Sequence, residues 1–336
     1  MSEVFAFAIG TTVENRSGDI IDCFFPAPIK SPNSHIADSI TEHFEWGVQA
    51  VSPDALEAYL DATNSRSSII GTLLSRAQSP LVSVCLEEDE PIGSTAEAYL
   101  KLHLLSHRLA LPNTLNLEGI FAHLPNVAWT TEGAVDVSEL EERQLEARLK
   151  GQHLEVLSVD KFPKMTNYVV PSGVRIADAS RVRLGAYIGD GTTVMHEGLM
   201  NFNSGALGPN MVEGRISQGV VLGEHSDLGG SSSTMGTLSG GGQISITIGQ
   251  HCLVGANAGT GIPLGDRCTI EAGLYITAGT PVRVIDELGV ETKTVKAREL
   301  AGCSDMLFIR NGQTGQIQCR TNRKAIELNE QLHSHN

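Results

Sequence analysis

A glutamate and an arginine, Glu213 and Arg215, stand on either side of one glycine in the run MVEGRIS. A carboxylate in this setting can take a proton from an attacking amine. A neighbouring guanidinium can hold that carboxylate ionised, or it can bind a substrate carboxylate through two parallel hydrogen bonds. The same pair also occurs on surface loops without any catalytic role. The residue types leave these interpretations open, so the elements that carry the pair must decide between them.

The pair lies within a stretch in which apolar residues return at every sixth position. A small residue follows four positions after nearly every one of them. This spacing is typical of a parallel β-helix, in which each hexapeptide forms one short strand and one corner. We expect a left-handed β-helix whose periodic side chains point into the prism. The series is Ile176, Val182, Ile188, Val194, Met200, Ile216, Leu222, Leu228, Ile248, Val254, Leu264, Ile270, Ile276 and Val282.

The six-residue period is interrupted at residues 206–214 and 233–244, and it shifts phase slightly at Pro263. An interruption in a solenoid is typical of an insertion that loops out from one face, and that face often carries the binding site. We therefore expect both segments to be inserted loops, with Glu213 at the end of the first.

Three parts are predicted along the chain: an N-terminal α/β domain over residues 1–167, a β-helix domain over 168–282 and a C-terminal segment over 283–336. In the first part, residues 4–9, 20–25, 81–86 and 156–160 have the pattern of strands, and 53–62 and 96–109 that of helices. Ser52 is placed to cap the first helix, and Ser138 with Glu141 predicts a capping box before a helix over 140–150. In the last part we expect a hairpin over 306–320 and a helix over 322–333.

Composition excludes several classes of function. The formal net charge of −15 argues against binding to nucleic acid or to an anionic membrane surface. The chain has neither an apolar stretch long enough to span a bilayer nor a signal peptide, so we expect a cytoplasmic protein. Its six cysteines form no CxxC pair, and Cys252 and Cys268 fall on small-residue positions where we expect buried packing groups. Walker, dinucleotide-binding and GxSxG motifs do not occur.

Three runs, HEGLMNFNSG, MVEGRISQGVVLGEHSDLGGSSSTMGTLSGGGQ and GANAGTGIPLGDRCTIEAGLYITAGT, resemble the longer form of the tetrahydrodipicolinate N-succinyltransferase family. The resemblance covers about residues 169–311. It implies a homotrimer of left-handed β-helices that acts on small-molecule substrates. It also implies transfer of succinyl from succinyl-CoA to the amine of ring-opened tetrahydrodipicolinate (L-2-amino-6-oxopimelate), in the diaminopimelate route to lysine.

The resemblance places the family's catalytic carboxylate on Glu213, as a base or as a nucleophile that forms an acyl anhydride. We favour the base, because a free amine already attacks a thioester readily. The backbone N–H of Gly230 would face the thioester, and Lys296 and Arg310 would suit the CoA phosphates, although each glycine also has the simpler role of a corner. The implied succinyl-CoA contacts are Arg215, Gly230, Ser233, Ala256, Glu271, Ala272, Gly279, Lys296, Ile309, Arg310, Asn311 and Gly312.

A magnesium ion near the trimer axis is also implied, with Glu197 and Asp178 as ligands; a hydrated surface glutamate is the alternative at 197. Other functions stay open beside the succinyltransferase. A different hexapeptide acyltransferase would act on a sugar amine or on serine with acetyl-CoA. A metal hydratase like the γ-carbonic anhydrases would use His196, His225 and His251, and a non-catalytic scaffold would use none of these residues.

Overall fold

The computed structural model describes residues 3–238 and 244–321 of the chain. It divides into two compact units, of which the first comprises residues 1–110, 114–163 and 167–169. The second comprises residues 111–113, 164–166 and 170–336. The helix expected over 322–333 lies outside the described residues. No helix in the described ranges is long and apolar enough to cross a membrane.

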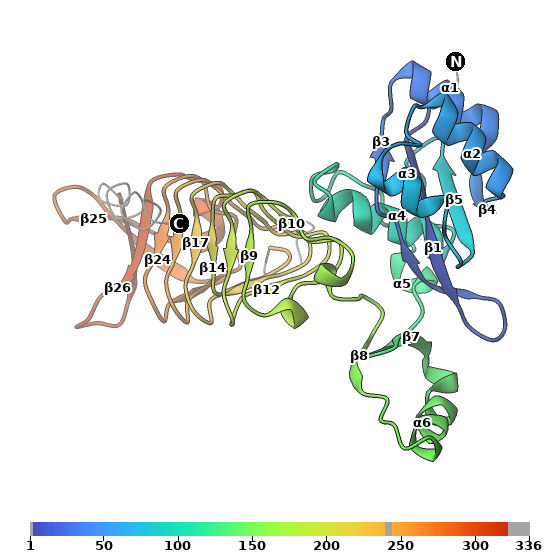
Figure 1. Cartoon of the computed structure of the whole chain (residues 1–336). Coiled ribbons are helices and arrows are strands. Elements are labelled where there is room, and N and C mark those ends of the chain that lie inside the picture. Colours follow the sequence, from blue (N-terminus) through green and yellow to red (C-terminus); the bar gives the residue numbers. More distant parts are fainter. Residues whose placement is uncertain (1–2, 239–243, 322–336) are drawn as a thin grey trace. The chain divides into compact units, whose positions relative to one another are not determined.

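An antiparallel sheet forms the centre of the first unit (Figure 1). Its strands follow the order β2-β1-β5-β4, with β3 paired to β1. They are β1 (Ala6–Glu14), β2 (Ile20–Phe24), β3 (Ile29–Lys30), β4 (Gly47–Ala50) and β5 (Leu81–Leu86). The helices are α1 (Ser34–His43), α2 (Pro53–Ala62), α3 (Ile69–Leu74), α4 (Thr95–Ser106) and α5 (Ile120–His123). The strands and helices expected over 4–9, 20–25, 53–62, 81–86 and 96–109 coincide with β1, β2, α2, β5 and α4, apart from a few terminal residues.

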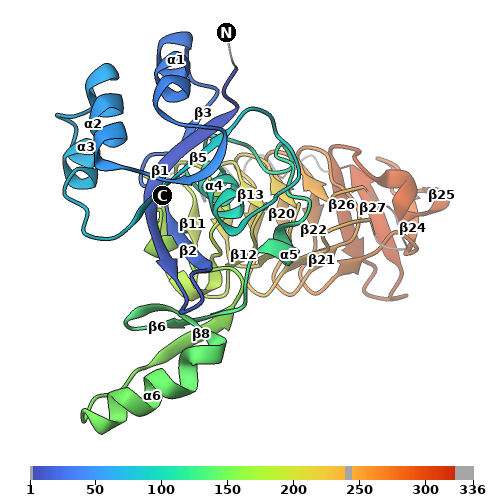
Figure 2. The same cartoon turned by 90° about the vertical axis from the view of Figure 1, so that its right-hand side faces the viewer.

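One face of this sheet packs against α1 and α2, which lie on the same side in Figure 2. Phe7 of β1 contacts the rings of Phe44 and Tyr59 at centroid distances of 5.1 and 5.5 Å. Helix α2 begins as its sequence predicts, because the Ser52 side chain accepts a hydrogen bond from the N–H of Ala55.

Helix α4 is almost wholly buried and packs against β2 and β5. Its His103 is fully buried, donates from Nδ1 to the carbonyl of Tyr99 and accepts at Nε2 from the N–H of Phe25. Burial lowers the pKa of His103 to about 3. The imidazole is therefore neutral at physiological pH.

A smaller sheet of the first unit has the order β7-β6-β8 and is accompanied by α6 (Leu140–Leu149). Its strands are β6 (Val127–Thr130), β7 (Gly133–Asp136) and β8 (Val156–Asp160). The predicted capping box at Ser138 is wrong: a short 3-10 helix, η1 (Val137–Glu139), precedes α6. Asp136 accepts from the N–H and Oγ of Ser138 at 2.8 and 2.7 Å, so the turn begins two residues earlier.

Three parallel sheets form the prism of the second unit (Figure 1), and the second residue of nearly every strand is buried in its centre. The predicted parallel β-helix is thereby confirmed. Sheet 1 contains β10 (Tyr187–Ile188), β13 (Gly205–Ala206), β16 (Val221–Leu222) and β19 (Thr247–Ile248). Sheet 2 contains β9 (Arg175–Ile176), β11 (Thr193–Val194), β14 (Met211–Val212), β17 (Asp227–Leu228), β20 (Leu253–Val254) and β22 (Thr269–Ile270). Sheet 3 contains β12 (Leu199–Met200), β15 (Arg215–Ile216), β18 (Ser233–Thr234), β21 (Gly259–Thr260) and β23 (Tyr275–Ile276).

The interruption at 206–214 is not an inserted loop, and that expectation is wrong. Strands β13 and β14 stay in their sheets, and only Glu213 and Gly214 connect β14 to β15. The corresponding corners after β11, β17 and β20 each have four residues. The phase change is therefore a corner shortened by two residues.

The second interruption is an insertion, but it begins after β18 rather than within it. Thr237 pairs with Ser245, and the N–H of Leu238 donates to the carbonyl of Ile244 at 2.9 Å. The phase shift at Pro263 is also present, because Leu264 pairs with Ile248 of sheet 1 only four residues after Thr260 of β21.

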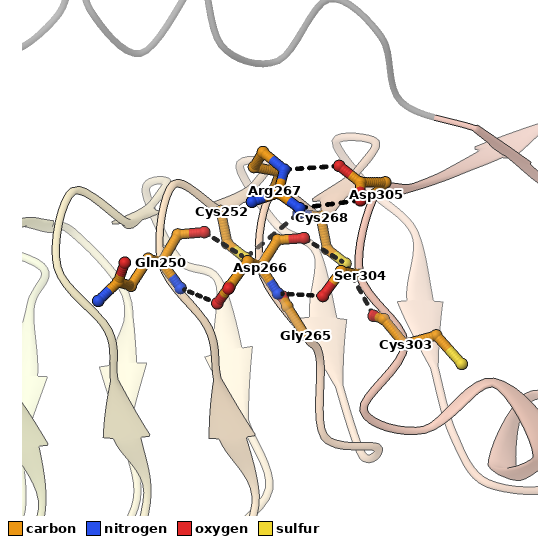
Figure 3. A network of polar contacts seen from close by, with 9 residues as sticks. All are labelled: Gln250, Cys252, Gly265, Asp266, Arg267, Cys268, Cys303, Ser304 and Asp305. Atoms are coloured by element: carbon orange, nitrogen blue, oxygen red, sulfur yellow. Dashed lines mark hydrogen bonds and ion pairs between the residues drawn. The ribbon is translucent and has the colours of Figure 1, made fainter.

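Two hairpins and a short 3-10 helix complete sheet 2 beyond β22. They consist of β24 (Pro281–Ile285), β25 (Glu291–Lys296), η4 (Ala297–Leu300), β26 (Met306–Arg310) and β27 (Ile317–Thr321), so the hairpin expected over 306–320 is confirmed. Strand β26 pairs in parallel with β22. Figure 3 shows the polar contacts that fasten the loop before β26 to the last coil, including Asp266 N–H to Ser304 Oγ at 3.0 Å. Cys252 and Cys268 are buried there, as expected.

Candidate functional site

The corners between sheet 2 and sheet 3 stack along one edge of the prism, which we call the 2–3 edge. Successive corners on it are formed by residues 177–180, 195–198, 213–214, 229–232, 255–258 and 271–274. Seven of the fifteen site residues expected from the sequence fall on this edge, namely Asp178, Glu197, Glu213, Gly230, Ala256, Glu271 and Ala272. Positions almost 100 residues apart in the chain thus share one line on the surface.

The shortened corner holds the half-buried Glu213 between two longer neighbours. Its N–H donates to the carbonyl of Leu228 at 2.8 Å, and its own carbonyl accepts from the N–H of Ser231. A side chain at Gly214 would place Cβ 2.2 Å from Oγ of Ser232 and 2.6 Å from its carbonyl oxygen. Glycine is therefore required for this corner to stack closely on the next one.

Gly230 faces a small open space between two carboxylates. The position of an ideal Cβ on Gly230 lies 3.5 Å from Oε2 of Glu197 and 3.6 Å from Oε2 of Glu213. Apart from its chain neighbours, no other atom of the described residues lies within 4 Å of that point. The backbone of Gly230 does not have a positive φ, so its conformation alone does not demand glycine. The missing side chain instead leaves room beside both carboxylates.

Glu197 is held from two sides. Oγ of Ser231 donates to Oε2 of Glu197 at 2.6 Å. The guanidinium of Arg181 donates to the carbonyls of Glu197 and Gly198 at 3.0 and 3.2 Å, which fixes the backbone of the corner. Ser231 adopts a left-handed backbone conformation with φ of 56°.

Arg215 lies at the start of β15, beside the 2–3 edge. Its Nη2 donates to Oγ of Ser233 on β18 at 2.6 Å. An ion pair with Glu213 does not occur among the described residues. The part of the chain that the structure describes therefore gives no ion pair that would hold Glu213 ionised, and the binding of a substrate carboxylate by Arg215 stays a prediction.

The turn after β26 lies next to the far end of the 2–3 edge. The N–H of Arg310 donates to Oε2 of Glu271 at 2.7 Å. Asn311 shapes the turn, because its Oδ1 accepts from the N–H groups of Gln313 and Thr314. Ile309 is half-buried and Gly312 exposed in the same turn.

Gly279 and Lys296 are not on the 2–3 edge of their own chain. Gly279 lies in the corner that follows β23 of sheet 3, and Lys296 pairs with Pro281 two residues further on. Both are exposed. The expected succinyl-CoA residues of one chain therefore form two separate groups.

The two residues expected to hold magnesium do not form a metal site within one chain. Oδ1 of Asp178 accepts from the N–H and Oγ of Ser180 at 3.0 and 2.6 Å, which lowers the pKa of Asp178 and caps the 3-10 helix η3 (Ala179–Arg181). Oε2 of Glu197 is engaged by Ser231. The described ranges contain no group of three or more His, Cys, Asp or Glu residues that could hold an ion.

The three histidines considered for a hydratase are also separated. His225 and His251 stack with ring centroids 5.0 Å apart, in corners between sheet 1 and sheet 2. His196 lies on the 2–3 edge.

Sequence reasoning missed Ser231 and Arg181. Ser231 occupies the third position of its corner, where His225, His251, Asn257 and Arg267 also have left-handed backbones in their corners. That periodic position gives no sign that the hydroxyl contacts a carboxylate from another coil. Arg181 is half-buried at the end of the 3-10 helix η3, and an arginine at this position carries no sequence signal of its own.

The whole chain is similar to known proteins. The profile described as "Tetrahydrodipicolinate N-succinyltransferase middle" matches residues 124–164, and "Hexapeptide repeat of succinyl-transferase" matches 245–278. A protein of Pseudomonas aeruginosa named 2,3,4,5-tetrahydropyridine-2,6-dicarboxylate N-succinyltransferase is 58% identical over 340 residues, covering 99% of both chains. A protein of Vibrio cholerae with the same name is 53% identical at the same coverage. A solved structure from Campylobacter jejuni, titled as a 2,3,4,5-tetrahydropyridine-2-carboxylate N-succinyltransferase, has a TM-score of 0.88 at 29% identity, covering 97% of this chain and 94% of that one.

Proposed function

Because the chain belongs to the tetrahydrodipicolinate N-succinyltransferase family, we propose that its reaction takes place at the 2–3 edge with Glu213 as general base. The enzyme transfers succinyl from succinyl-CoA to the amino group of L-2-amino-6-oxopimelate, the ring-opened form of tetrahydrodipicolinate, in diaminopimelate and lysine biosynthesis. What remains to be assigned is the role of each side chain.

The amine nitrogen attacks the thioester carbonyl carbon and forms a C–N bond, which gives a tetrahedral adduct with a negatively charged oxygen. Glu213 takes a proton from this nitrogen, and the C–S bond then breaks. The proton passes to the departing sulfur, so the products are the succinyl amide and CoA-SH. A backbone N–H such as that of Gly230 stabilises the oxyanion, as in other acyl transfers.

The observation that carries this assignment is the open space at Gly230. A carboxylate oxygen of the half-buried Glu213 lies 3.6 Å from the point that a Cβ on Gly230 would occupy, so it borders the side of Gly230 that carries no side chain. A reacting nitrogen that rests against this side of Gly230, at van der Waals distance from its Cα, faces the base. The tight Glu213-Gly214 corner holds this geometry on the backbone of the β-helix rather than on a loop.

We assign the succinyl carboxylate to Arg215 and Ser233, which already share a hydrogen bond of 2.6 Å. The backbone at Ala256, Glu271 and Ala272 continues the 2–3 edge toward the turn at 309–312, where Arg310 suits a CoA phosphate.

A homotrimer of left-handed β-helices would complete this site. Gly279 and Lys296 lie away from the 2–3 edge of their own chain, so an adjacent copy could supply them to one CoA molecule. A magnesium ion near a threefold axis stays a prediction. The residues of one chain alone do not form a site for it, and no step above depends on the ion. A cytoplasmic location is consistent with an enzyme of lysine biosynthesis.

The decisive experiment is a thiol-release assay with tetrahydrodipicolinate and either succinyl-CoA or acetyl-CoA. We expect succinyl-CoA to be strongly preferred, and Glu213→Gln to lower kcat by about 100-fold or more with little change in the KM for succinyl-CoA. The matched control is Glu224→Gln, an exposed corner glutamate between sheet 1 and sheet 2. Preference for acetyl-CoA, or full turnover by Glu213→Gln, would refute the assignment.

A further inference from the structure

We propose that Glu271 is a positioning residue for Arg310. Its carboxylate fixes the backbone of the turn that presents Arg310 to a CoA phosphate, and it does not contact the cosubstrate itself. The inference rests on the proposed function, because it concerns the end of the site that we assign to CoA. It replaces the direct contact with succinyl-CoA that the family resemblance implies for this side chain.

The first argument is the way in which the ladder between β22 and β26 ends. Ile270 pairs with Phe308, and the N–H of Glu271 then donates to the carbonyl of Phe308 at 3.0 Å. In a regular parallel ladder, the next hydrogen bond would run from the N–H of Arg310 to the backbone carbonyl of Glu271. That N–H donates instead to Oε2 of Glu271 at 2.7 Å. The carboxylate therefore takes the place of a backbone carbonyl.

The second argument explains why a side chain is needed at this point. The chain turns at Glu271 into the corner that leads to β23, and the backbone carbonyl of Glu271 accepts from the N–H of Leu274 at 3.2 Å. Strand β26 does not turn there, because it continues to Arg310. Without the carboxylate, the N–H of Arg310 would lose its acceptor, and the end of β26 would be held less firmly to the last coil.

The third argument comes from earlier coils, in which the corresponding corners begin with a glycine. The carbonyls of Gly229 and Gly255 accept from the N–H groups of Ser232 and Ala258, three residues further on, at 2.9 and 3.0 Å. The coil stacked on each of these corners turns at the same place, so no straight strand has to be held there. The carboxylate at the equivalent position of the last coil coincides with a strand that runs on past the corner.

Beyond Arg310, the turn is shaped by its own residues. Oδ1 of Asn311 accepts from the N–H groups of Gln313 and Thr314, both at 3.0 Å. The N–H of Gly315 donates to the carbonyl of Asn311 at 2.8 Å. Glu271 links this preformed turn to the β-helix, and it makes this link at the residue that carries the guanidinium.

The fourth argument is electrostatic. A carboxylate that faced a CoA phosphate directly would repel it. The carboxylate of Glu271 is instead engaged by the backbone of the turn, while the side chain of Arg310 is exposed. A guanidinium matches the geometry of a phosphate group. Support of the backbone therefore accounts for a glutamate beside a phosphate-binding arginine better than contact with the ligand does.

The test measures kcat and KM with two succinyl donors, succinyl-CoA and succinyl-pantetheine, of which the second lacks the nucleotide and all phosphates. In the full-length enzyme, Glu271→Ala should raise the KM for succinyl-CoA about five- to tenfold and change kcat less than about twofold. Glu271→Gln should stay within about twofold of wild type, because its amide oxygen can still accept the hydrogen bond. With succinyl-pantetheine, Glu271→Ala should match the wild type.

A second measurement combines Glu271 with Arg310. Arg310→Ala should raise the KM for succinyl-CoA at least as much as Glu271→Ala does, and the double variant should be no worse than Arg310→Ala. The control is Glu224→Ala, at an exposed corner glutamate between sheet 1 and sheet 2, which should keep the wild-type values. Thermal unfolding shows whether each variant is folded. If Glu271→Ala is not folded, Glu271→Asp replaces it with the same expectations, because its carboxylate is one methylene too short.

An unchanged KM in folded Glu271→Ala would overturn the proposal. A Glu271→Gln variant as impaired as Glu271→Ala would also overturn it, since the charge would then contact the cosubstrate directly. Equal losses with both donors, or losses that add up in the double variant, would show that Glu271 does not act through Arg310. If the wild type releases no thiol from succinyl-CoA with tetrahydrodipicolinate, the proposed function itself fails, which is seen without any variant.

Discussion

Nε and Nη2 of Arg267 contact Oδ1 and Oδ2 of Asp305 at 2.6 and 2.9 Å, forming a two-pronged ion pair (Figure 3). Arg267 lies in the corner before β22, and Asp305 directly precedes β26. The same guanidinium lowers the pKa of Asp305. The pair thus fastens the β26 strand, and the turn that contains Arg310, to the last coil of the β-helix.

Arg267→Ala should weaken binding of succinyl-CoA more than it slows the chemical step. Loss of the pair loosens the segment that carries Arg310, while Glu213 and Gly230 are untouched. We expect the KM for succinyl-CoA to rise about three- to tenfold, as for a charge-assisted contact of about 1 kcal/mol, and kcat to change less than twofold. Steady-state kinetics measure both. Arg66→Ala, which removes a surface ion pair with Asp61 in the first unit, is the control; equal effects of the two variants would contradict the prediction.

Gly214→Ala should destabilise the β-helix. The new methyl group would lie 2.2 Å from Oγ and 2.6 Å from the carbonyl oxygen of Ser232, and the backbone contact cannot be relieved by a rotamer change. We expect a loss of about 1–3 kcal/mol in the free energy of unfolding, together with loss of turnover. Chemical unfolding followed by circular dichroism provides the measurement, and an unaltered transition would show that the corner can relax.

Gly230→Ala adds the same methyl group in the next corner, but it should lower turnover and leave the stability almost unchanged. Apart from its chain neighbours, the atoms of the described residues that its methyl group would meet are two carboxylate oxygens, at 3.5 and 3.6 Å, and its φ is not positive. Stability should remain within about 0.5 kcal/mol of wild type. Turnover should fall at least tenfold, because the methyl group fills the space assigned to the amine. Full activity in a folded Gly230→Ala variant would show that the substrate does not enter there.

The first unit should lose stability as the pH falls below neutrality because of His103. Its unfolded form takes up a proton near pH 6.5, whereas in the folded unit burial lowers the pKa to about 3. The unfolded state therefore binds more protons between these values, and the free energy of unfolding decreases by up to about 1.4 kcal/mol per pH unit as pH falls.

His103→Gln should remove this contribution to the pH dependence. Asp22, whose pKa is raised by burial, acts in the opposite direction but is present in both proteins. The difference between wild type and His103→Gln in urea unfolding at pH 7 and pH 5 therefore isolates the histidine. A difference that does not vary with pH would disprove this assignment.

The periodic part of the fold could be predicted from sequence, because the apolar side chain of each hexapeptide is buried only when it points into the prism. Val212 and Ile216 show where this reasoning failed. Their four-residue spacing predicts an insertion, although Val212 follows Ala206 by six residues and is therefore in phase. The sequence shows that the six-residue phase changes at this point. An added loop and a shortened corner produce the same change of phase, so the sequence does not distinguish them. Only the pairing of β14 with β11 and β17 distinguishes them.

The candidate site was predictable to the extent that its residues occupy corners at regular intervals. The resemblance to the family identified Glu213 and Gly230 as site residues, and the stacking of coils places both on the 2–3 edge. The contact of Ser231 with Glu197 was not predictable, because it joins side chains 34 positions apart whose rotamers depend on neighbouring coils. Similarly, the cap of the turn before α6 is Asp136 and not Ser138, because Oδ1 of Asp136 accepts a hydrogen bond from the N–H of Ser138.

The hairpin of β26 and β27 also has a consequence for solubility. A column of stacked parallel strands ends in a row of unpaired N–H and C=O groups, which is a template for end-to-end growth into filaments. Here β26 occupies that row on β22, and β27, β24 and the mostly exposed, charge-bearing β25 follow it, with β24–β25 and β26–β27 antiparallel. This change of strand direction leaves sheet 2 without a parallel edge on which a further coil could be added, so the segment to which we assign contacts with CoA also closes the end of that sheet.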